Sequence, residues 1–300
     1  MGNLGQIVEF VKHSLAGFDA SKDSVTALSS PITSTSLTVP IDDTDVQRGA
    51  SRGIAEIDME IVRVKDVDRD AGALVLYPFG RGYRGTTAAA HSAGVEVRLN
   101  PEWPASTVAR EVNGVLTEIY PRLYAVSTHE TVVPSDLGAI DVPEEAVGII
   151  AVYIEDRLRD DQWVRLDTWR FQRDSSDIGR PLRIGGHQTI GDAVRVVYAH
   201  RPGLFNLEGG LSQDFETVTG LNPGVEDLIR LGVATRMAPF IDVARLPFVV
   251  TEAKADAGAR PATGGASAAR LLYSMFQARL EQEVAALHRD HPIRLHFTGR

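Results

Sequence analysis

The chain contains 300 residues, of which 43% are hydrophobic and 24% are charged, and this composition is typical of a globular protein rather than a collagen-like or disordered one. Its length predicts two domains, or one domain with a large insertion. The sequence has no cysteine, which excludes disulfides, thiolate nucleophiles and zinc sites built on sulfur. The net charge of -9 argues against a broad basic surface wrapped on DNA.

The sequence predicts neither a membrane segment nor a secretion signal. No run of about 18 apolar residues is present, so we expect no membrane-spanning helix. Near the N-terminus, Glu9 and Lys12 interrupt the apolar stretch and a basic leader is missing, which is unlike a signal peptide. We therefore expect a soluble protein that stays inside the cell.

The first hundred residues predict a short helix, an arm and a hairpin. Apolar residues at helical spacing predict a helix over residues 4–16. Residues 20–40 are rich in Ser and Thr, which favour turns, so we expect a loop or extended arm there, continuing to about residue 52. Strands are expected over residues 57–67, 73–77 and 95–99, with a glycine-rich loop at 80–85.

The remaining residues predict one helix, a set of short strands and two further helices. Pro101, Pro104 and Pro121 delimit the clearest helix, which presents one apolar face. Small residues over 253–267 predict a flexible linker. Strands are expected over 147–155, 162–173, 181–184 and 193–200, and helices over 222–238 and 267–287.

These elements predict an α+β fold, in which a helical core is assembled from distant segments and an antiparallel β-sandwich or barrel-like domain is inserted. We expect residues 1–140 to form a helical and hairpin region with an extended arm at about 20–52. Residues 141–205 are the expected β domain. Residues 206–300 are the expected helical region that closes the core.

One glycine pattern suggests a nucleotide site, but its surroundings oppose that interpretation. Gly80, Gly82 and Gly85 follow a predicted strand with the spacing G-x-G-x-x-G. A dinucleotide site needs a helix next, because the helix N-terminus binds the pyrophosphate. Only residues 86–94 precede the next predicted strand, too few for a crossover helix. The pattern therefore predicts a turn, and we expect no bound cofactor.

The other chemistry-bearing residues do not converge in the sequence. His288, His291 and His296 are separated by a proline that ends the helix, so we expect no metal site. His91 stands beside Ser92 without the G-x-S-x-G elbow of a hydrolase. We therefore expect no catalytic residue and no enzyme activity. Paired carboxylates in turn-like stretches are interpreted as solvated loop charge, at Glu144–Glu145 and Asp160–Asp161.

The glycine-rich loop carries the candidate interface residues of the sequence. Arg81, Tyr83 and Arg84 place two guanidinium groups around one aromatic ring. Such a group could contact phosphates or pair with the carboxylates of a neighbouring subunit. The alternative is a hairpin tip with solvated arginines.

Two neighbouring segments are similar to virion proteins of tailed bacteriophages. Residues 81–97 (RGYRGTTAAAHSAGVEV) resemble the pattern R-G-x-x-G-T-x-A-x-x-H-x-x-G-x-x-V. That pattern typically follows a hairpin of the form E-x-x-x-V-x-x-V-D, and residues 60–68 (EIVRVKDVD) stand in this place. Residues 103–124 are similar to a helix of phage head-to-tail connector, or adaptor, proteins. The resemblance covers residues 57–124, with looser likeness elsewhere.

The resemblance implies a structural protein of the virion neck. Connectors form a homo-oligomeric ring, usually of twelve copies, between the portal protein and the tail proteins. Genome DNA passes through this ring without specific binding, and an acidic inner surface would favour its sliding. The implied location is the host cytoplasm during assembly and the virion afterwards, with no membrane partner.

Two alternatives remain open at this point. The R-G-x-x-G-T signature also occurs in phage tail and baseplate proteins, which assemble with six-fold or three-fold symmetry. The alternative of another class is a glycan-binding module or an enzyme, because Trp163 and Trp169 lie in the predicted β region. A glycan-binding module would keep such rings exposed for stacking, whereas a connector would bury them or place them at subunit contacts.

Overall fold

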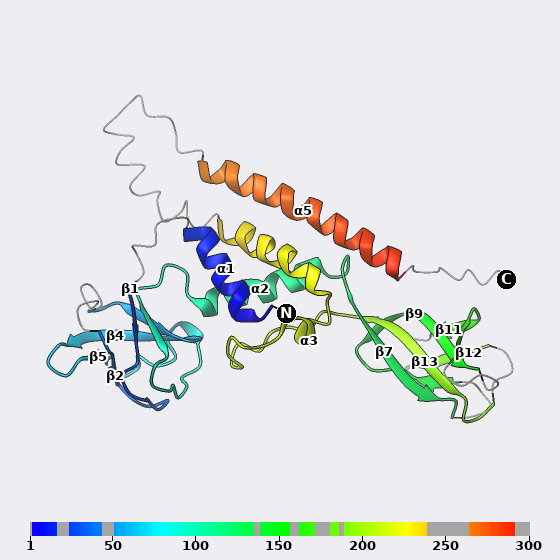
Figure 1. The fold of residues 1–300 in the computed structure, drawn as a ribbon, viewed down its shortest axis with the longest axis horizontal. Helices are drawn as coiled ribbons and strands as arrows, with labels where there is room; N and C mark the ends of the chain where they lie inside the picture. Colours follow the sequence, from blue (N-terminus) through cyan, green and yellow to red (C-terminus); the bar gives the residue numbers. More distant parts are fainter. Residues whose placement is uncertain are drawn as a thin grey trace. The chain divides into compact units, whose positions relative to one another are not determined.

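The computed structural model describes residues 2–16, 24–43, 51–134, 139–156, 162–171, 181–185, 189–238 and 264–291. These residues form a mixed α+β protein (Figure 1). The chain divides into two compact units. Unit 1 comprises Met1–Leu116, Leu204–Val218 and Pro223–Gln277, and unit 2 comprises Thr117–Gly203, Thr219–Asn222 and Ala278–Arg300. Each unit thus contains segments that are far apart in the sequence.

Unit 1 contains a six-stranded antiparallel sheet that curls into a half-barrel. The strand order is β1-β6-β3-β4-β5-β2. The two outer strands are themselves linked by an isolated bridge between Leu28, after β1, and Ile41, after β2. The sheet therefore surrounds an apolar interior that includes Val39, Val62 and Leu74. The strands are β1 (Ser24–Ala27), β2 (Thr38–Pro40), β3 (Ile54–Ile57), β4 (Glu60–Asp68), β5 (Ala73–Leu76) and β6 (Glu96–Leu99).

The described part of the expected loop or extended arm at 20–52 is not loop throughout, because it contains β1 and β2. Residues 17–23 and 44–50 lie outside the described residues. The Ser- and Thr-rich composition concealed sparse apolar positions, among them Leu28, Ile32 and Val39, which are buried in the half-barrel. Since threonine is β-branched and strand-compatible, its abundance does not exclude strands.

The first helices of unit 1 begin and end as the sequence predicts. Helix α1 spans Leu4–Ala16 and α2 spans Ala105–Ile119. The backbone N–H groups of Thr107 and Val108 donate to the carbonyl of Pro104, 2.9 and 3.0 Å away, so the proline begins the first turn of α2.

A buried ion pair connects both of these helices to the half-barrel. The ammonium group of Lys12 on α1 lies 2.8 Å from a carboxylate oxygen of Glu56 on β3. The other oxygen of Glu56 accepts a hydrogen bond of 2.9 Å from the N–H of Ala105 at the start of α2. Burial raises the pKa of Glu56, and the adjacent Lys12 opposes that rise.

A helix over residues 226–238 and the long helix α5 (Gly264–Asp290) complete the helical segments. A Cβ atom at Gly232 would lie 2.7 Å from Cγ1 of Val115 and 2.8 Å from a ring carbon of Phe276. The backbone of the 226–238 helix therefore contacts side chains of α2 and α5 closely. The expected linker at 253–267 is wrong in its last four residues, which belong to α5, and residues 253–263 lie outside the described residues.

Unit 2 consists of two antiparallel sheets that share one apolar cluster. One sheet has the order β10-β9-β13-β7 and the other has the order β11-β12-β8. Val152 and Val196 of the first sheet and Leu182 of the second lie in the same buried cluster. The strands are β7 (Ala125–Val132), β8 (Ala139–Asp141), β9 (Ala146–Glu155), β10 (Trp163–Leu166), β11 (Trp169–Phe171), β12 (Pro181–Ile184) and β13 (Ala193–His200).

The strand expected over 162–173 is divided, because β10 and β11 belong to different sheets. Between them the carbonyl of Thr168 accepts a hydrogen bond from the N–H of Gly185. Residues 172–180 lie outside the described residues. Among the helices that the structure describes, none is both long and apolar enough to cross a membrane.

Replacing Gly232 by valine should lower the free energy of unfolding by about 1–3 kcal/mol, because the new side chain overlaps Val115 and Phe276. Urea-induced unfolding followed by circular dichroism measures this change. The matched control is Gly148→Val in β9, where a Cβ atom meets no heavy atom within 4 Å. Equal stability of the two variants would contradict the close packing of residues 226–238.

Candidate functional site

The residues that carry the phage-like pattern meet around one buried carboxylate, that of Glu60 on β4. Its two oxygens accept hydrogen bonds of 2.8 Å from the guanidinium of Arg81, one from Nε and one from Nη2. The backbone N–H groups of Gly82 and Ala89 donate to the same oxygens at 2.9 and 3.1 Å. Nε2 of His91 lies 3.0 Å from Oε2. We call these five residues the Glu60 cluster.

Arg81 also connects the Glu60 cluster to the segment between β1 and β2. Its guanidinium donates to the backbone carbonyls of Thr33 and Ser36 on that segment, and to that of Ala89. The side chain of Arg81 is 7% exposed. Its five N–H donors are therefore used inside the protein, and its expected role as an interface residue has no geometric basis.

The glycines and the threonine of the pattern shape the loop around the cluster. Gly82 and Gly85 have positive φ angles of 57° and 76°, which glycine adopts without the strain of a side chain. The hydroxyl of Thr86 donates to the carbonyl of Tyr83 and accepts from the N–H of Ile61, at 2.9 and 3.0 Å. Each of these pattern positions thus serves the conformation of the loop.

Hydrogen bonding fixes the charges inside the Glu60 cluster. Burial alone would raise the pKa of Glu60, but donation from Arg81, His91 and the backbone lowers it to about 2. Burial would lower the pKa of His91, but its hydrogen bonds with Asp58 and Glu60 raise it to about 9. Nδ1 of His91 lies 2.9 Å from Asp58. At neutral pH the cluster therefore holds an imidazolium between two carboxylates.

Two of the three predicted interface residues remain at the surface. Arg84 is exposed and has a φ of 56°. Its Cζ lies 5.9 Å from the ring centroid of Tyr83, which is half-buried. In addition, Cζ of Arg63 lies 5.6 Å from the same centroid and 4.6 Å from that of Tyr77. Sequence reasoning missed Arg63 and Tyr77 because Arg63 lies on β4 and Tyr77 follows β5, so their contact is not visible along the chain.

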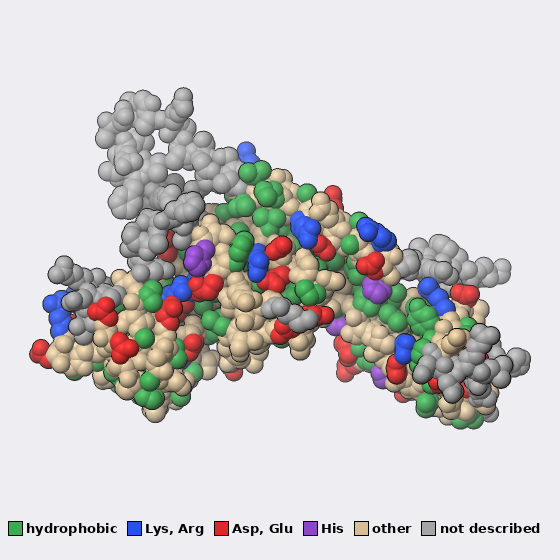
Figure 2. Space-filling view, viewed as in Figure 1, with side chains coloured by type: hydrophobic (Ala, Val, Ile, Leu, Met, Phe, Trp, Pro, Cys, Tyr) green, Lys and Arg blue, Asp and Glu red, His purple; other side chains and the backbone are tan. Residues whose placement is uncertain are grey.

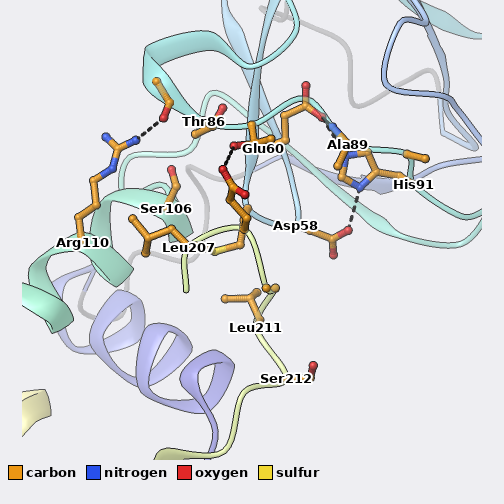
Figure 3. A pocket seen from close by; sticks show the side chains of 17 residues that line it. Asp58, Glu60, Thr86, Ala89, His91, Ser106, Arg110, Leu207, Leu211 and Ser212 are labelled. Carbon is orange, nitrogen blue, oxygen red and sulfur yellow. Dashed lines mark hydrogen bonds and ion pairs between the residues drawn. The ribbon is translucent and has the colours of Figure 1, made fainter. Parts of the chain in front are cut away.

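A cavity of about 730 Å³ lies beside the Glu60 cluster in unit 1. Figure 3 shows its lining, in which the loop over residues 207–212 lies opposite the glycine-rich loop and the first turn of α2. Half-buried Leu207 and Leu211 contribute apolar surface, and Asp58 and Glu208 contribute carboxylates. The guanidinium of Arg110 donates to the backbone carbonyl of Gly85 at the margin.

The glycine pattern forms a turn, as predicted, and no helix follows it directly. A 3-10 turn over Tyr83–Gly85 leads through residues 86–95 to β6. In the described part of the chain, no three His, Asp or Glu side chains are grouped so that they could hold a metal ion. His288 and His291 lie at the end of α5, whereas His296 and Asp160–Asp161 lie outside the described residues.

The two tryptophans do not share a strand, so the expected aromatic platform has no basis in one regular strand. Trp163 on β10 is half-buried, and Cζ of Arg195 lies 4.0 Å from its ring centroid. Trp169 on β11 packs against the apolar cluster between the sheets of unit 2. Unit 2 also contains a serine–histidine contact of 2.9 Å between Ser127 and His200. Nδ1 of this histidine faces the carbonyl of Arg201, and the described contacts include no carboxylate on that ring.

Acidic and basic side chains are interspersed on the face of the molecule in Figure 2, and apolar side chains gather over α5. Leu271, Tyr273 and Met275 are the exposed large apolar residues of that helix.

No protein-family model matches the chain, and no curated protein is significantly similar to it.

Replacing Glu60 by glutamine should lower the free energy of unfolding by about 3–5 kcal/mol, because it leaves the Arg81 guanidinium buried without its counter-charge. Denaturant-induced unfolding measures the loss. Glu96→Gln is the control, since this half-exposed carboxylate pairs with Arg98 at the surface and should change stability by less than about 1 kcal/mol. Similar losses of unfolding free energy in both variants would show that the buried Glu60 cluster stabilises the fold no more than a surface ion pair does.

The free energy of unfolding should decrease as the pH rises from about 6.5 to about 9. The pKa of His91 is raised from 6.5 to about 9 in the folded state. Its contribution to the free energy of unfolding is therefore complete below pH 6.5 and is lost as the pH rises through about 9. Glu60 has the opposite sign: its contribution is complete above pH 4.5 and is lost as the pH falls towards 2. The measurement compares the free energy of unfolding of the wild-type chain with that of His91→Gln between about pH 6 and 10, the range in which His91 titrates. An unchanged alkaline slope in that variant would refute the assignment to His91.

Proposed function

We propose that this chain is a structural protein of a tailed-bacteriophage virion, and specifically a head-to-tail connector that forms a ring between the portal and the tail. The observation that carries the proposal is the Glu60 cluster. Residues that match the phage pattern at separate positions, among them Glu60, Arg81, Gly82 and His91, contact one another in a single buried network. A chance match of a short pattern has no reason to bring its members together in this way.

The helix that follows the pattern adds to this support. The segment similar to a connector helix, residues 103–124, contains α2, and α2 is joined to the half-barrel through Glu56. The finer part of the proposed architecture is a helical core built from distant segments. It is supported by the close approach of Gly232 to α2 and α5 and by an ion pair of 2.6 Å between Arg236 and Glu111 on α2.

The proposal includes partners and a location. The chain would associate with copies of itself, usually twelve, and with the portal and the tail or neck proteins. Genome DNA would pass through the ring without specific binding, and the protein would move from the host cytoplasm into the virion. The resemblance implies no catalytic activity, and the proposal includes none.

The runner-up within the same class is a tail or baseplate protein, because those proteins share the R-G-x-x-G-T signature. A glycan-binding module is less well supported, since Arg195 covers one face of Trp163 and Trp169 packs in the apolar cluster. Stoichiometry distinguishes the first two: a twelve-fold ring favours the connector, whereas six-fold or three-fold assembly favours a tail component.

We expect the purified chain to form a twelve-fold ring when it is mixed with the portal protein of the same virion. Light scattering gives the mass of the assembly, and electron microscopy gives its symmetry. Glu96→Gln, which changes a surface pair, serves as a control variant that should assemble normally. A stable monomer or trimer that does not bind the portal would rule out the connector.

A further inference from the structure

We propose that the exposed ring of Phe79 enters the cavity between the glycine-rich loop and residues 207–212 of a second copy of this chain. This contact deepens the proposed ring function, on which it rests, by naming the surfaces that meet. The protruding side chain and the cavity both belong to unit 1 and are different surfaces of it. A contact between two different surfaces is the kind that builds a closed ring when its rotation closes.

Phe79 is presented to solvent by a fixed turn. Its side chain is 91% exposed, far more than the other large apolar residues of the described chain. The N–H of Gly80 donates to the carbonyl of Tyr77 at 2.8 Å, and the carbonyl of Gly80 accepts from Arg63 at 2.7 Å. A Cβ atom at Gly80 would lie 2.7 Å from the carbonyl of Arg63, so only glycine permits this approach. The ring is therefore held outward at little further entropic cost on binding.

The surface next to Phe79 is positively charged and aromatic. The guanidinium of Arg63 lies over the rings of both Tyr77 and Tyr83, and that of Arg84 lies over the Tyr83 ring. Among the described residues, neither arginine forms an ion pair with a carboxylate. Aromatic residues and arginine are the types enriched in the energetic centres of protein interfaces. This surface therefore fits a partner that offers apolar volume bordered by carboxylates.

The cavity of unit 1 has this chemistry. Leu207 and Leu211 are half-buried on its lining and carry no aromatic partner there, and at about 730 Å³ the cavity has room for a phenyl ring. The carboxylate of Asp58 is 51% exposed, and that of Glu208 accepts a hydrogen bond from Thr87 without a cation among the described residues. Figure 3 shows Asp58 and the two leucines around the opening.

Charge complementarity argues for a second copy as the occupant. Arg63 and Arg84 beside Phe79 form no ion pair with a carboxylate among the described residues, and the same chain supplies the carboxylates of Asp58 and Glu208, with one arginine, Arg110, in the lining of a partly apolar cavity. The cluster that holds Arg81 also holds Asp58 through His91, so the loop that carries Arg84 also fixes Asp58 at the cavity. Neither surface has to rearrange to bind the other.

The absence of cysteine from the sequence permits a direct test by disulfide crosslinking. The variants Phe79→Cys and Ala90→Cys are made separately, since Ala90 is an exposed residue of the cavity lining. After the two full-length proteins are mixed and oxidised, we expect a product of twice the chain mass. The matched control replaces Phe79→Cys by Val25→Cys, which is also exposed in unit 1 but lies on β1.

A second measurement does not depend on disulfide geometry. Phe79→Ala should weaken self-association at least about tenfold in sedimentation velocity, because truncating a central aromatic residue removes a large part of interface energy. Its thermal stability should equal that of the wild-type chain, since the ring contacts solvent.

Each outcome bears on one of the two proposals. Crosslinking no stronger than in the Val25→Cys control, or unchanged association of Phe79→Ala, would overturn the Phe79 contact. A twelve-fold ring on the portal that persists in Phe79→Ala would leave the connector function standing and reject only this contact. Specific crosslinking by a chain that ignores the portal would reject the connector and retain the contact between copies.

Discussion

The carboxylate of Glu60 is the group on which the arrangement of unit 1 depends. Removing a charge of this kind from water is costly, and the cost is offset only when the remaining lone pairs find donors. Arg81, His91 and two backbone N–H groups are these donors, and they come from a loop whose regular structure is limited to one 3-10 turn and one isolated bridge. The contacts of the Glu60 carboxylate thus order a loop that contains no strand and no α-helix. Its position in turn determines the wall of the adjacent cavity.

A second buried carboxylate lies on the neighbouring strand. Glu56 of β3 binds Lys12 of α1 and the first N–H of α2, so one side chain joins three elements that are distant in the sequence. Between the two glutamates, Asp58 has a φ of 52°, an uncommon value for a residue with a side chain. The tight connection from β3 to β4 is therefore flanked on both sides by buried ionic contacts, which hold it in this conformation.

This arrangement changes the interpretation of the phage-like pattern. A recurring R-G-x-x-G-T-x-A-x-x-H spacing suggests a binding loop, yet Arg81 and His91 face inward and the glycines satisfy positive φ angles. The residues of the pattern fix the conformation of the loop, whereas other residues provide the side chains that are exposed at its surface. Phe79, Arg63 and Arg84 are outside the invariant positions of the pattern, and they are the groups that solvent or a partner meets.

The sequence by itself determined the helices at 4–16 and 105–119 and most strands, because the periodicity of apolar residues and the prolines act locally. It also determined that the glycine pattern is a turn, since residues 86–94 leave no room for a helix. Only the tertiary structure decided that β1 and β2 are strands, because Leu28 and Val39 gain their burial from strands elsewhere in the half-barrel. In the same way, the inward direction of Arg81 depends on Glu60, 21 positions earlier in the chain, and a sequence read residue by residue does not contain that contact.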